Sequence, residues 1–242
     1  MDSRHICRPK EKNLEIENNT SVILLAAGNY KYFKRSVSTI ELPNGEIVLE
    51  RQLKAIKKYL PNADITVVLG HDLKYSLSKI SEKIQNIRIV INEKFAETNN
   101  TKSLYLSILA GQKENLLVIN GDILFDYTYI KDCVGKQSTV VIDKTGQITP
   151  DEPGTIISNG VVENISHGLD DIWSQIVFLR NEEKQKCKRL ISIEKNWNKY
   201  LYEILNLVID DGGIFVPKYK DVGYIKELDN FKDLEKVNEI FI

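Results

Sequence analysis

Residues 21–28 read SVILLAAG, a run that is apolar from Val22 to Ala27 and ends in a glycine. An apolar run of this length is typical of a strand that is buried on both faces of a parallel sheet. Because alanine and glycine have little or no side chain, the backbone at the end of this strand can approach a phosphate or a base closely. The stretch therefore predicts a central strand and one wall of a ligand site.

The sequence after this strand alternates between helical and strand-like patterns. Apolar residues recur at helical spacing in residues 49–60 and 73–84, and a further helix is expected over 101–112. The strand-like runs are 64–69 (DITVVL), 87–91 (IRIVI) and 116–120 (LLVIN). Strands that alternate with helices of this length are typical of βαβ units, so we expect an α/β fold with a mainly parallel sheet.

The pattern changes after residue 143. Short strand-like pieces at 154–157 and 161–165 flank Ser158-Asn159-Gly160, a sequence typical of a tight hairpin turn. Another short strand is expected at 175–179, and helices are expected at about 181–190, 197–209 and 231–241. Since no linker separates the two halves, we expect residues 21–242 to form one domain, with residues 1–20 as a mobile or loosely packed extension.

The composition excludes several classes of function. Lys and Arg total 33 against 34 Asp and Glu, so the chain lacks the basic excess that bulk binding to nucleic acid or to an anionic membrane requires. The three cysteines are far apart and lack metal-ligand spacing, which favours reduced thiols in a cytoplasmic protein. No apolar run reaches about 18 residues, so we expect no transmembrane helix and no membrane partner.

Asn120-Gly121-Asp122 follows the most apolar strand-like run of the chain. In an open α/β sheet, ligands bind beyond the carboxyl ends of the strands, so Asp122 is expected at the same edge as Gly28. Hard divalent cations prefer carboxylate oxygens, and they are usually held by one or two carboxylates together with substrate phosphates. A turn aspartate that caps a helix beginning near Asp126 is the alternative, and the residues alone leave it open.

Five segments, in this order, resemble those of the sugar-phosphate and phosphocholine nucleotidyltransferases. They are LLAAG at 24–28, NG at 44–45 with LERQL at 49–53, NEKF, ETNN and SL between 92 and 104, NGD at 120–122, and ELD at 227–229 with DLEK at 233–236. Together they extend over about residues 21–240. The resemblance implies a three-layer, Rossmann-like nucleotidyltransferase fold with a mixed, mainly parallel sheet and a small β-rich extension on the acceptor side.

The resemblance also implies roles for individual residues. Asp122 and Asp229 would bind one Mg²⁺ that bridges the nucleotide phosphates. The nucleotide would contact Leu25, Ala26, Ala27, Gly28, Asn99, Asn100, Ser103 and Gly121. Asn99 and Asn100 are also compatible with simple N-capping of the helix that follows them.

The implied reaction is transfer of a nucleotidyl group from a nucleoside triphosphate to a small phosphorylated alcohol, amine or sugar, with release of pyrophosphate. A preference for CTP is inferred from residues 98–104 alone. His167, in a Ser-His-Gly turn, lies in the region where relatives shape the acceptor pocket.

The signature loop departs from the family pattern. Tyr30 and Tyr32 stand where the family has glycine and arginine, and Ser36-Val37 replaces its Pro-Lys pair. We expect Lys31, Lys34 or Arg35 to supply the missing positive charge. A catalytically weak or inactive nucleotide-binding homologue is the main alternative. A glycosyltransferase is a minor one, since Asp122 is followed by Ile123-Leu124 and not by a D-x-D pair.

Overall fold

The computed structural model describes residues 11–29, 32–146 and 148–240. The strands are β1 (Thr20–Ala26), β2 (Asp64–Leu69), β3 (Arg88–Ile91), β4 (Asn115–Asn120), β5 (Ile123–Phe125), β6 (Thr139–Asp143), β7 (Gly154–Ser158), β8 (Val161–Ser166), β9 (Asp171–Leu179), β10 (Val216–Lys220) and β11 (Ile225–Glu227). The helices are α1 (Glu11–Asn18), α2 (Val48–Tyr59), α3 (Leu73–Lys83), α4 (Asn100–Leu109), α5 (Thr128–Cys133), α6 (Asn181–Ile191), α7 (Leu201–Asp210) and α8 (Phe231–Ile240), with short 3₁₀ turns at Val37–Thr39 and Glu194–Asn196.

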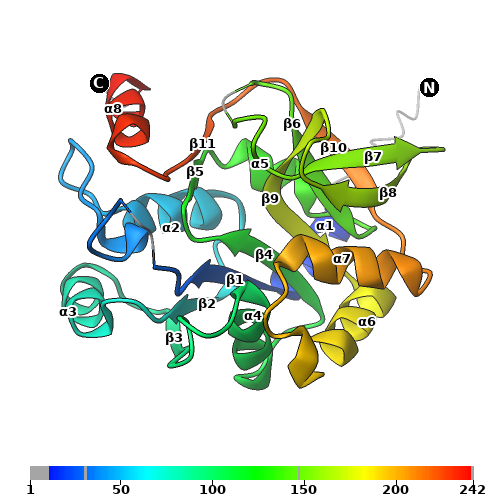
Figure 1. The fold of residues 1–242 in the computed structure, drawn as a ribbon, viewed down its shortest axis with the longest axis horizontal. Helices are drawn as coiled ribbons and strands as arrows, with labels where there is room; N and C mark the ends of the chain where they lie inside the picture. Colours follow the sequence, from blue (N-terminus) through cyan, green and yellow to red (C-terminus); the bar gives the residue numbers. More distant parts are fainter. Residues whose placement is uncertain (1–10, 30–31, 147, 241–242) are drawn as a thin grey trace, which may run out of the picture.

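The centre of the fold is a nine-stranded sheet with the path β10-β6-β9-β4-β1-β2-β3 (Figure 1). Strand β1 lies inside it and pairs in parallel with β2 and β4, so that Leu24 is opposite Val67 on one side and Ile119 on the other. The β7–β8 hairpin pairs with β9, while β5 and β11 form a separate antiparallel ribbon. The predicted α/β class with a mixed, mainly parallel sheet is confirmed.

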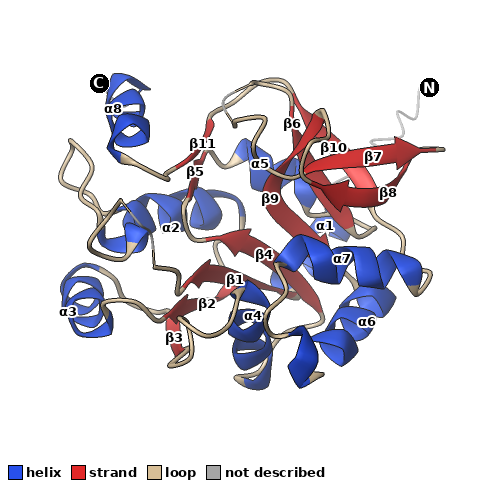
Figure 2. Cartoon of the chain, in the orientation of Figure 1, coloured by secondary structure: helices blue, strands red, loops and turns tan. Residues whose placement is uncertain are grey.

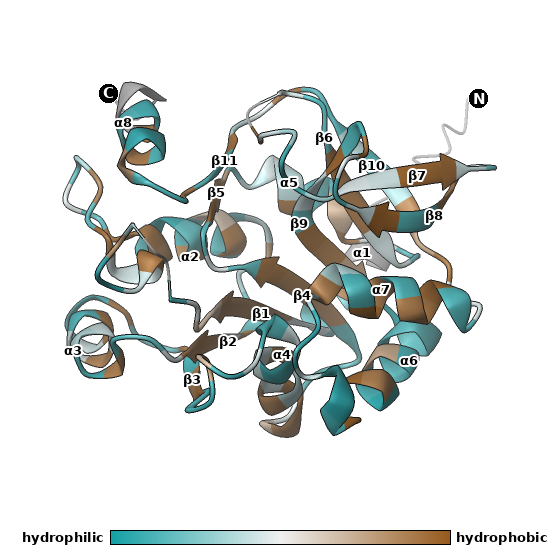
Figure 3. Ribbon diagram, viewed as in Figure 1, coloured by the Kyte–Doolittle hydropathy of each residue, from teal (hydrophilic) through white to brown (hydrophobic). Residues whose placement is uncertain are grey.

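Alternate residues of β1 belong to two different cores. Val22, Leu24 and Ala26 pack with residues of α2 and α5, whereas Ile23 and Leu25 pack with residues of α4, α6 and α7. Helices therefore cover both faces of the sheet and make three layers (Figure 2). Figure 3 shows β1 and β4 coloured as hydrophobic, as expected for strands that are covered on both faces.

The later strands join the same sheet. Strand β9 runs antiparallel between β4 and β6, and it begins at Asp171, earlier than the short strand expected at 175–179. The predicted hairpin turn is confirmed, since β7 and β8 are joined by Asn159 and Gly160, both with positive φ (51° and 79°). Two consecutive residues with positive φ suit the tight turn that joins twisted antiparallel strands.

The structure differs from the expected loose extension at the start of the described chain. Residues 11–18 form α1, Ile16 packs against the core, and Thr20 already belongs to β1. The Thr20 hydroxyl donates a hydrogen bond to the Ile16 carbonyl (2.6 Å), which ties the helix to the strand. Among the α1 side chains that the structure describes, Ile16 packs against the core while Leu14 is exposed, so the apolar residues of this helix form no periodic face. Residues 1–10 lie outside the described part.

Two smaller expectations concern cysteines and membrane helices. Cys133 and Cys187 are buried free thiols, and burial raises the pKa of each to about 12. Cys7 lies outside the described residues. None of the described helices combines the length and the apolar character that crossing a bilayer requires.

We predict that Gly121→Ala destabilises the fold, because a Cβ at this position would lie 2.6 Å from Ala26 Cα and 2.8 Å from the Leu25 carbonyl oxygen. Overpacking of this kind costs ~1–3 kcal/mol of unfolding free energy, which urea denaturation measures. Gly135→Ala is the matched control, since a Cβ there meets nothing within 4 Å. Equal losses in the two variants would show that the β1–β4 approach is not the constraint.

Candidate active site

A cavity of 460 Å³ opens at the carboxyl ends of β1 and β4. Leu25, Ala27 and Gly28 form one wall, and the start of α4 forms another. The β9 residues Trp173 and Gln175 lie across from them. The cavity is thus at the sheet edge where an open α/β fold binds its ligands.

The wall at the start of α4 is held by hydrogen bonds from two directions. Asn92 is buried and donates from Nδ2 to the Ser103 hydroxyl (3.1 Å). The Asn99 amide donates to the Trp197 carbonyl (2.8 Å), and the Thr101 hydroxyl donates to the Lys199 carbonyl (2.6 Å). The segment before α7 therefore fixes where α4 begins.

Asn99 and Asn100 have different environments although they are neighbours. Asn99 is the N-cap of α4, and its Oδ1 accepts from the Asn100 amide (2.8 Å). Asn100 Oδ1 is buried and accepts no hydrogen bond from the residues that the structure describes. Both side chains line the cavity, so capping and ligand contact are compatible here.

The predicted nucleotide-binding residues divide into two groups. Leu25, Ala27, Gly28, Asn99, Asn100 and Ser103 line the cavity. Ala26 and Gly121 are not part of this lining: Ala26 faces the opposite core, and Gly121 packs against Ala26 while its amide donates to the Leu25 carbonyl (2.9 Å). The structure thus assigns Gly121 a packing role between β1 and β4.

The predicted basic residues do not gather at the cavity. Lys34 and Arg35 are exposed, neither belongs to the lining, and the Arg35 guanidinium lies 3.9 Å over the ring of Tyr75 on α3. Lys31 lies outside the described residues. Among the described residues that line the cavity there is no lysine or arginine.

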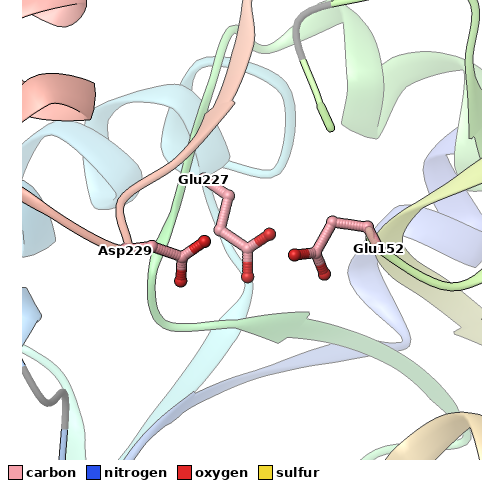
Figure 4. Close-up of side chains that lie close together, drawn as sticks. All are labelled: Glu152, Glu227 and Asp229. Atoms are coloured by element: carbon pink, nitrogen blue, oxygen red, sulfur yellow. The ribbon is translucent and has the colours of Figure 1, made fainter. Parts of the chain in front are cut away.

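Carboxylates line the acidic end of this cavity and extend into an adjoining pocket of 200 Å³, which Glu152 and Glu227 share with Asp229 and Lys226. Glu152, Glu227 and Asp229 each offer an oxygen atom, and these oxygens lie within 4.8 Å of one another (Figure 4). Asp122 is not in this group, but it lines the same cavity as Glu152 and Glu227. The antiparallel pairing of β11 with β5 brings the groups together, and the Leu228 amide donates to the Asp122 carbonyl (2.9 Å).

The acidic groups perturb one another strongly. Burial and then the charges of Asp122 and Glu152 raise the pKa of Glu227 well above its usual range. Burial, followed by the charges of Glu152 and Asp233, raises the pKa of Asp229. Like charges in a partly desolvated site disfavour ionisation, and a bound cation would relieve this.

The group has the donor chemistry of a divalent cation site. It offers only carboxylate oxygens, which Mg²⁺ prefers. Glu227 is 8% exposed, and its Oε2 accepts no hydrogen bond from any described residue. Asp229 belongs to this group of possible ligands. Coordination of one Mg²⁺ by Asp122 and Asp229 stays a prediction.

Sequence reasoning missed Glu227 and Glu152. Glu227 could have been found, because it precedes Asp229 by two residues and alternate residues of an extended chain share a face. Glu152 could not, because it lies in the loop between β6 and β7, in Pro-Asp-Glu-Pro, which has no period.

Aromatic side chains line the side of the cavity away from β1. Tyr200 and Tyr202 stack with ring centroids 5.7 Å apart, and His167 meets Tyr202 edge-on at 5.5 Å. His167 Nδ1 is 2.8 Å from the Asp151 carbonyl oxygen. Trp173, 2% exposed, closes this side, and Pro153 adjoins it.

The architecture is shared with several solved structures. The inositol-1-phosphate CTP transferase from T. maritima matches with a TM-score of 0.77 and 19% identity, over 92% of this chain and 94% of that one. The CTP:phosphocholine cytidylyltransferase from Streptococcus pneumoniae matches with a TM-score of 0.74 and 20% identity, over 93% and 100%. The nucleoside-diphosphate-sugar pyrophosphorylase from Vibrio cholerae RC9 matches with a TM-score of 0.68 and 10% identity, over 90% and 99%.

The chain has the nucleotidyltransferase fold. The resemblance read from the sequence is thereby confirmed at the level of the fold. No protein-family model and no curated protein sequence matches the chain. Within the nucleotidyltransferase fold, the cavity at the ends of β1 and β4 is the candidate active site.

We predict that Glu227→Gln stabilises the metal-free protein at pH 7.5. The pKa of Glu227 is raised in the folded state, so ionisation makes folding less favourable as the pH rises from the ordinary value of 4.5 through the raised value. Removing that charge should add on the order of 1 kcal/mol, a rise in Tm of about 2–4 °C for a chain of this size. Thermal unfolding in EDTA measures this.

The gain should disappear below pH 4.5, where Glu227 is protonated in both states. Glu163→Gln, which removes an exposed carboxylate on β8, is the control and should leave the Tm unchanged. A lower Tm for Glu227→Gln than for the wild type at pH 7.5 would contradict the electrostatic interpretation.

Proposed function

We propose that this protein transfers a nucleotidyl group from a nucleoside triphosphate to a small phosphorylated acceptor, with release of pyrophosphate and with Mg²⁺ as cofactor. The observation that carries the proposal is the convergence of carboxylates on a cavity at the sheet edge of a nucleotidyltransferase fold. Such transfers require positioning and charge neutralisation more than covalent chemistry from the protein.

The carboxylates would hold the metal ion. Glu152, Glu227 and Asp229 are the group with converging oxygens, and Asp122 approaches from the end of β4. When bound, Mg²⁺ supplies charge neutralisation for the triphosphate and for the developing negative charge. No described residue that lines the cavity is a lysine or arginine, so no described side chain there could replace the metal ion in this role.

The nucleotide base would lie between residues 25–28 and the start of α4. Asn100 Oδ1 is a buried acceptor without a described donor, and a base with an exocyclic amino group supplies one. Cytosine, adenine and guanine have such a group and uracil and thymine lack one, and two similar structures are named as a CTP transferase and a CTP:phosphocholine cytidylyltransferase. These observations support CTP as the proposed nucleotide.

The phosphorylated acceptor would occupy the aromatic side of the cavity. The rings of Tyr200, which is 52% exposed, and Tyr202 suit the ring of a sugar or cyclitol and also a cationic amine. A phosphorylated alcohol, amine or sugar therefore remains the proposed acceptor class, acting through its phosphate oxygen on the α-phosphorus. The cytoplasmic location inferred from the cysteines remains part of this proposal.

The main competing function is nucleotide binding without efficient turnover. It is favoured by the signature loop, because Lys34 and Arg35 lie outside the cavity lining. For efficient turnover, Lys34 or Arg35 would have to move into the cavity when substrate binds, or Lys31 would have to supply a positive charge.

We predict that mixing the protein with CTP, Mg²⁺ and a panel of phosphocholine, inositol 1-phosphate and glucose 1-phosphate releases pyrophosphate with at least one acceptor. A coupled phosphate assay with inorganic pyrophosphatase measures it, and omission of the acceptor is the control. CTP-dependent thermal stabilisation without pyrophosphate would favour the binding homologue. Stabilisation by a purine nucleotide and none by CTP would contradict the cytidine preference.

We predict that Asp122→Asn lowers kcat by about 10²-fold or more, since loss of a group that stabilises transition-state charge has effects of this size. Steady-state pyrophosphate release measures kcat. The exposed Asp170→Asn is the matched control and should retain wild-type kcat. Unchanged kcat in Asp122→Asn would remove Asp122 from the proposed metal site.

A further inference from the structure

Gln175 has a backbone conformation that its residue type rarely adopts. Its φ is 59°, in the left-handed region, although it lies within β9 and is only 5% exposed. For a residue with a Cβ this conformation costs roughly 1–2 kcal/mol, and glycine or asparagine is the usual occupant. Because the backbone conformation disfavours glutamine, the contacts of its side chain must explain why glutamine occupies this position.

An irregularity in the sheet produces this conformation. Val140 of β6 pairs with Val177 of β9, but Ile142 pairs with Trp173, so three residues of β9 stand opposite one residue of β6. The Trp173 indole N–H donates to the Ile176 carbonyl (3.0 Å) and closes the bulged segment. Bulges of this kind redirect side chains, and they are common next to active sites.

The bulge directs the Gln175 side chain into the cavity, where it makes two contacts. Its Oε1 accepts a hydrogen bond from Asn120 Nδ2 at the end of β4. Its Nε2 donates to Glu152 Oε2 at 3.0 Å. A single amide therefore connects the rigid centre of the sheet to a carboxylate on a loop.

The carboxamide can make both contacts at once, because it carries the acceptor that Asn120 requires and the donor that Glu152 requires. A carboxylate at position 175 could not donate to Glu152, and asparagine is one methylene shorter. Asn120 uses its Nδ2 on Gln175, which leaves its buried Oδ1 on the cavity wall with no hydrogen bond from a described residue. Glu227 Oε2, in the carboxylate group, is another buried oxygen that accepts no hydrogen bond from a described residue.

We infer that Gln175 is a positioning residue: it anchors the Glu152 carboxylate to β4 in the orientation in which Glu152, Glu227 and Asp229 share one divalent cation. The strained backbone is maintained because it delivers this anchor. The inference rests on the proposed function for its activity readout, whereas its cation-binding readout does not depend on turnover.

The test measures binding of Mn²⁺, a spectroscopic substitute for Mg²⁺, by electron paramagnetic resonance in the absence of nucleotide. Gln175→Met keeps the length of the side chain but loses both hydrogen bonds, and Gln175→Gly also relieves the φ of 59°. We expect the Mn²⁺ Kd to rise by about 10-fold or more in both variants, the size of effect seen when a group that orients a metal ligand is lost. Gln112→Met, on a hydrogen-bonded glutamine away from the cavity, should stay within twofold of the wild type.

Stability separates positioning from a purely structural role. Positioning predicts that Gln175→Gly weakens Mn²⁺ binding even if its Tm equals or exceeds that of the wild type, because relief of strain offsets the lost contacts. In turnover, both variants should need more Mg²⁺ for half-maximal rate and recover most of their kcat at saturating Mg²⁺.

Wild-type Mn²⁺ affinity in both Gln175 variants, or no Mn²⁺ binding by the wild type itself, would overturn the inference. Failure of the proposed function has a different signature, in which the wild type binds Mn²⁺ tightly and releases no pyrophosphate with any acceptor. The two failures are therefore distinguishable.

Discussion

The parallel pairing of β1 with β4 builds the edge of the sheet on which the candidate site lies. It brings the end of β1 and Asp122 to one edge of the sheet, and the approach is so close that position 121 has no room for a Cβ. We call this meeting point of β1 with residues 121–123 the corner of the site. The Gln52 side chain stabilises it by donating from Nε2 to the carbonyls of Gly121 (3.0 Å) and Ile123 (2.8 Å). A rigid corner of this kind is a suitable base for a site, because groups attached to it keep their geometry.

Onto this corner the fold adds three carboxylates that repel one another. Glu227 arrives on a two-stranded ribbon, Glu152 on a loop, and Asp229 on the chain that leads to α8. Their ionisation is unfavourable in the folded chain, as the raised pKa values of Glu227 and Asp229 indicate. A loss of folding stability caused by such unfavourable charges is typical of sites that bind a cation or a charged ligand.

The cavity combines this acidic end with an uncharged remainder. Asparagine, serine and backbone groups form the wall near α4, and aromatic rings form the wall near α7. The described basic residues that follow β1, Lys34 and Arg35, do not line the cavity, and Arg35 lies over the ring of Tyr75. An anionic substrate in this cavity would meet no lysine or arginine among the described lining residues, so the proposed function relies on a cation held by the carboxylate group for charge balance.

The sequence by itself indicated the α/β class, the buried strands, the Asn-Gly hairpin and the placement of Asp122 and Asn99 at the cavity. The class, the strands and the hairpin follow from apolar runs and turn residues, and the position of Asp122 follows from a strand end. The position of Asn99 was implied by the resemblance to the nucleotidyltransferases. Tertiary structure alone decided that Glu152 joins Glu227 and Asp229, that Gly121 serves packing, and that Arg35 lies away from the cavity. These outcomes depend on loop paths and on the register of β5 with β11 and of β6 with β9. Such pairings join residues far apart in sequence, so no periodicity along the chain records them.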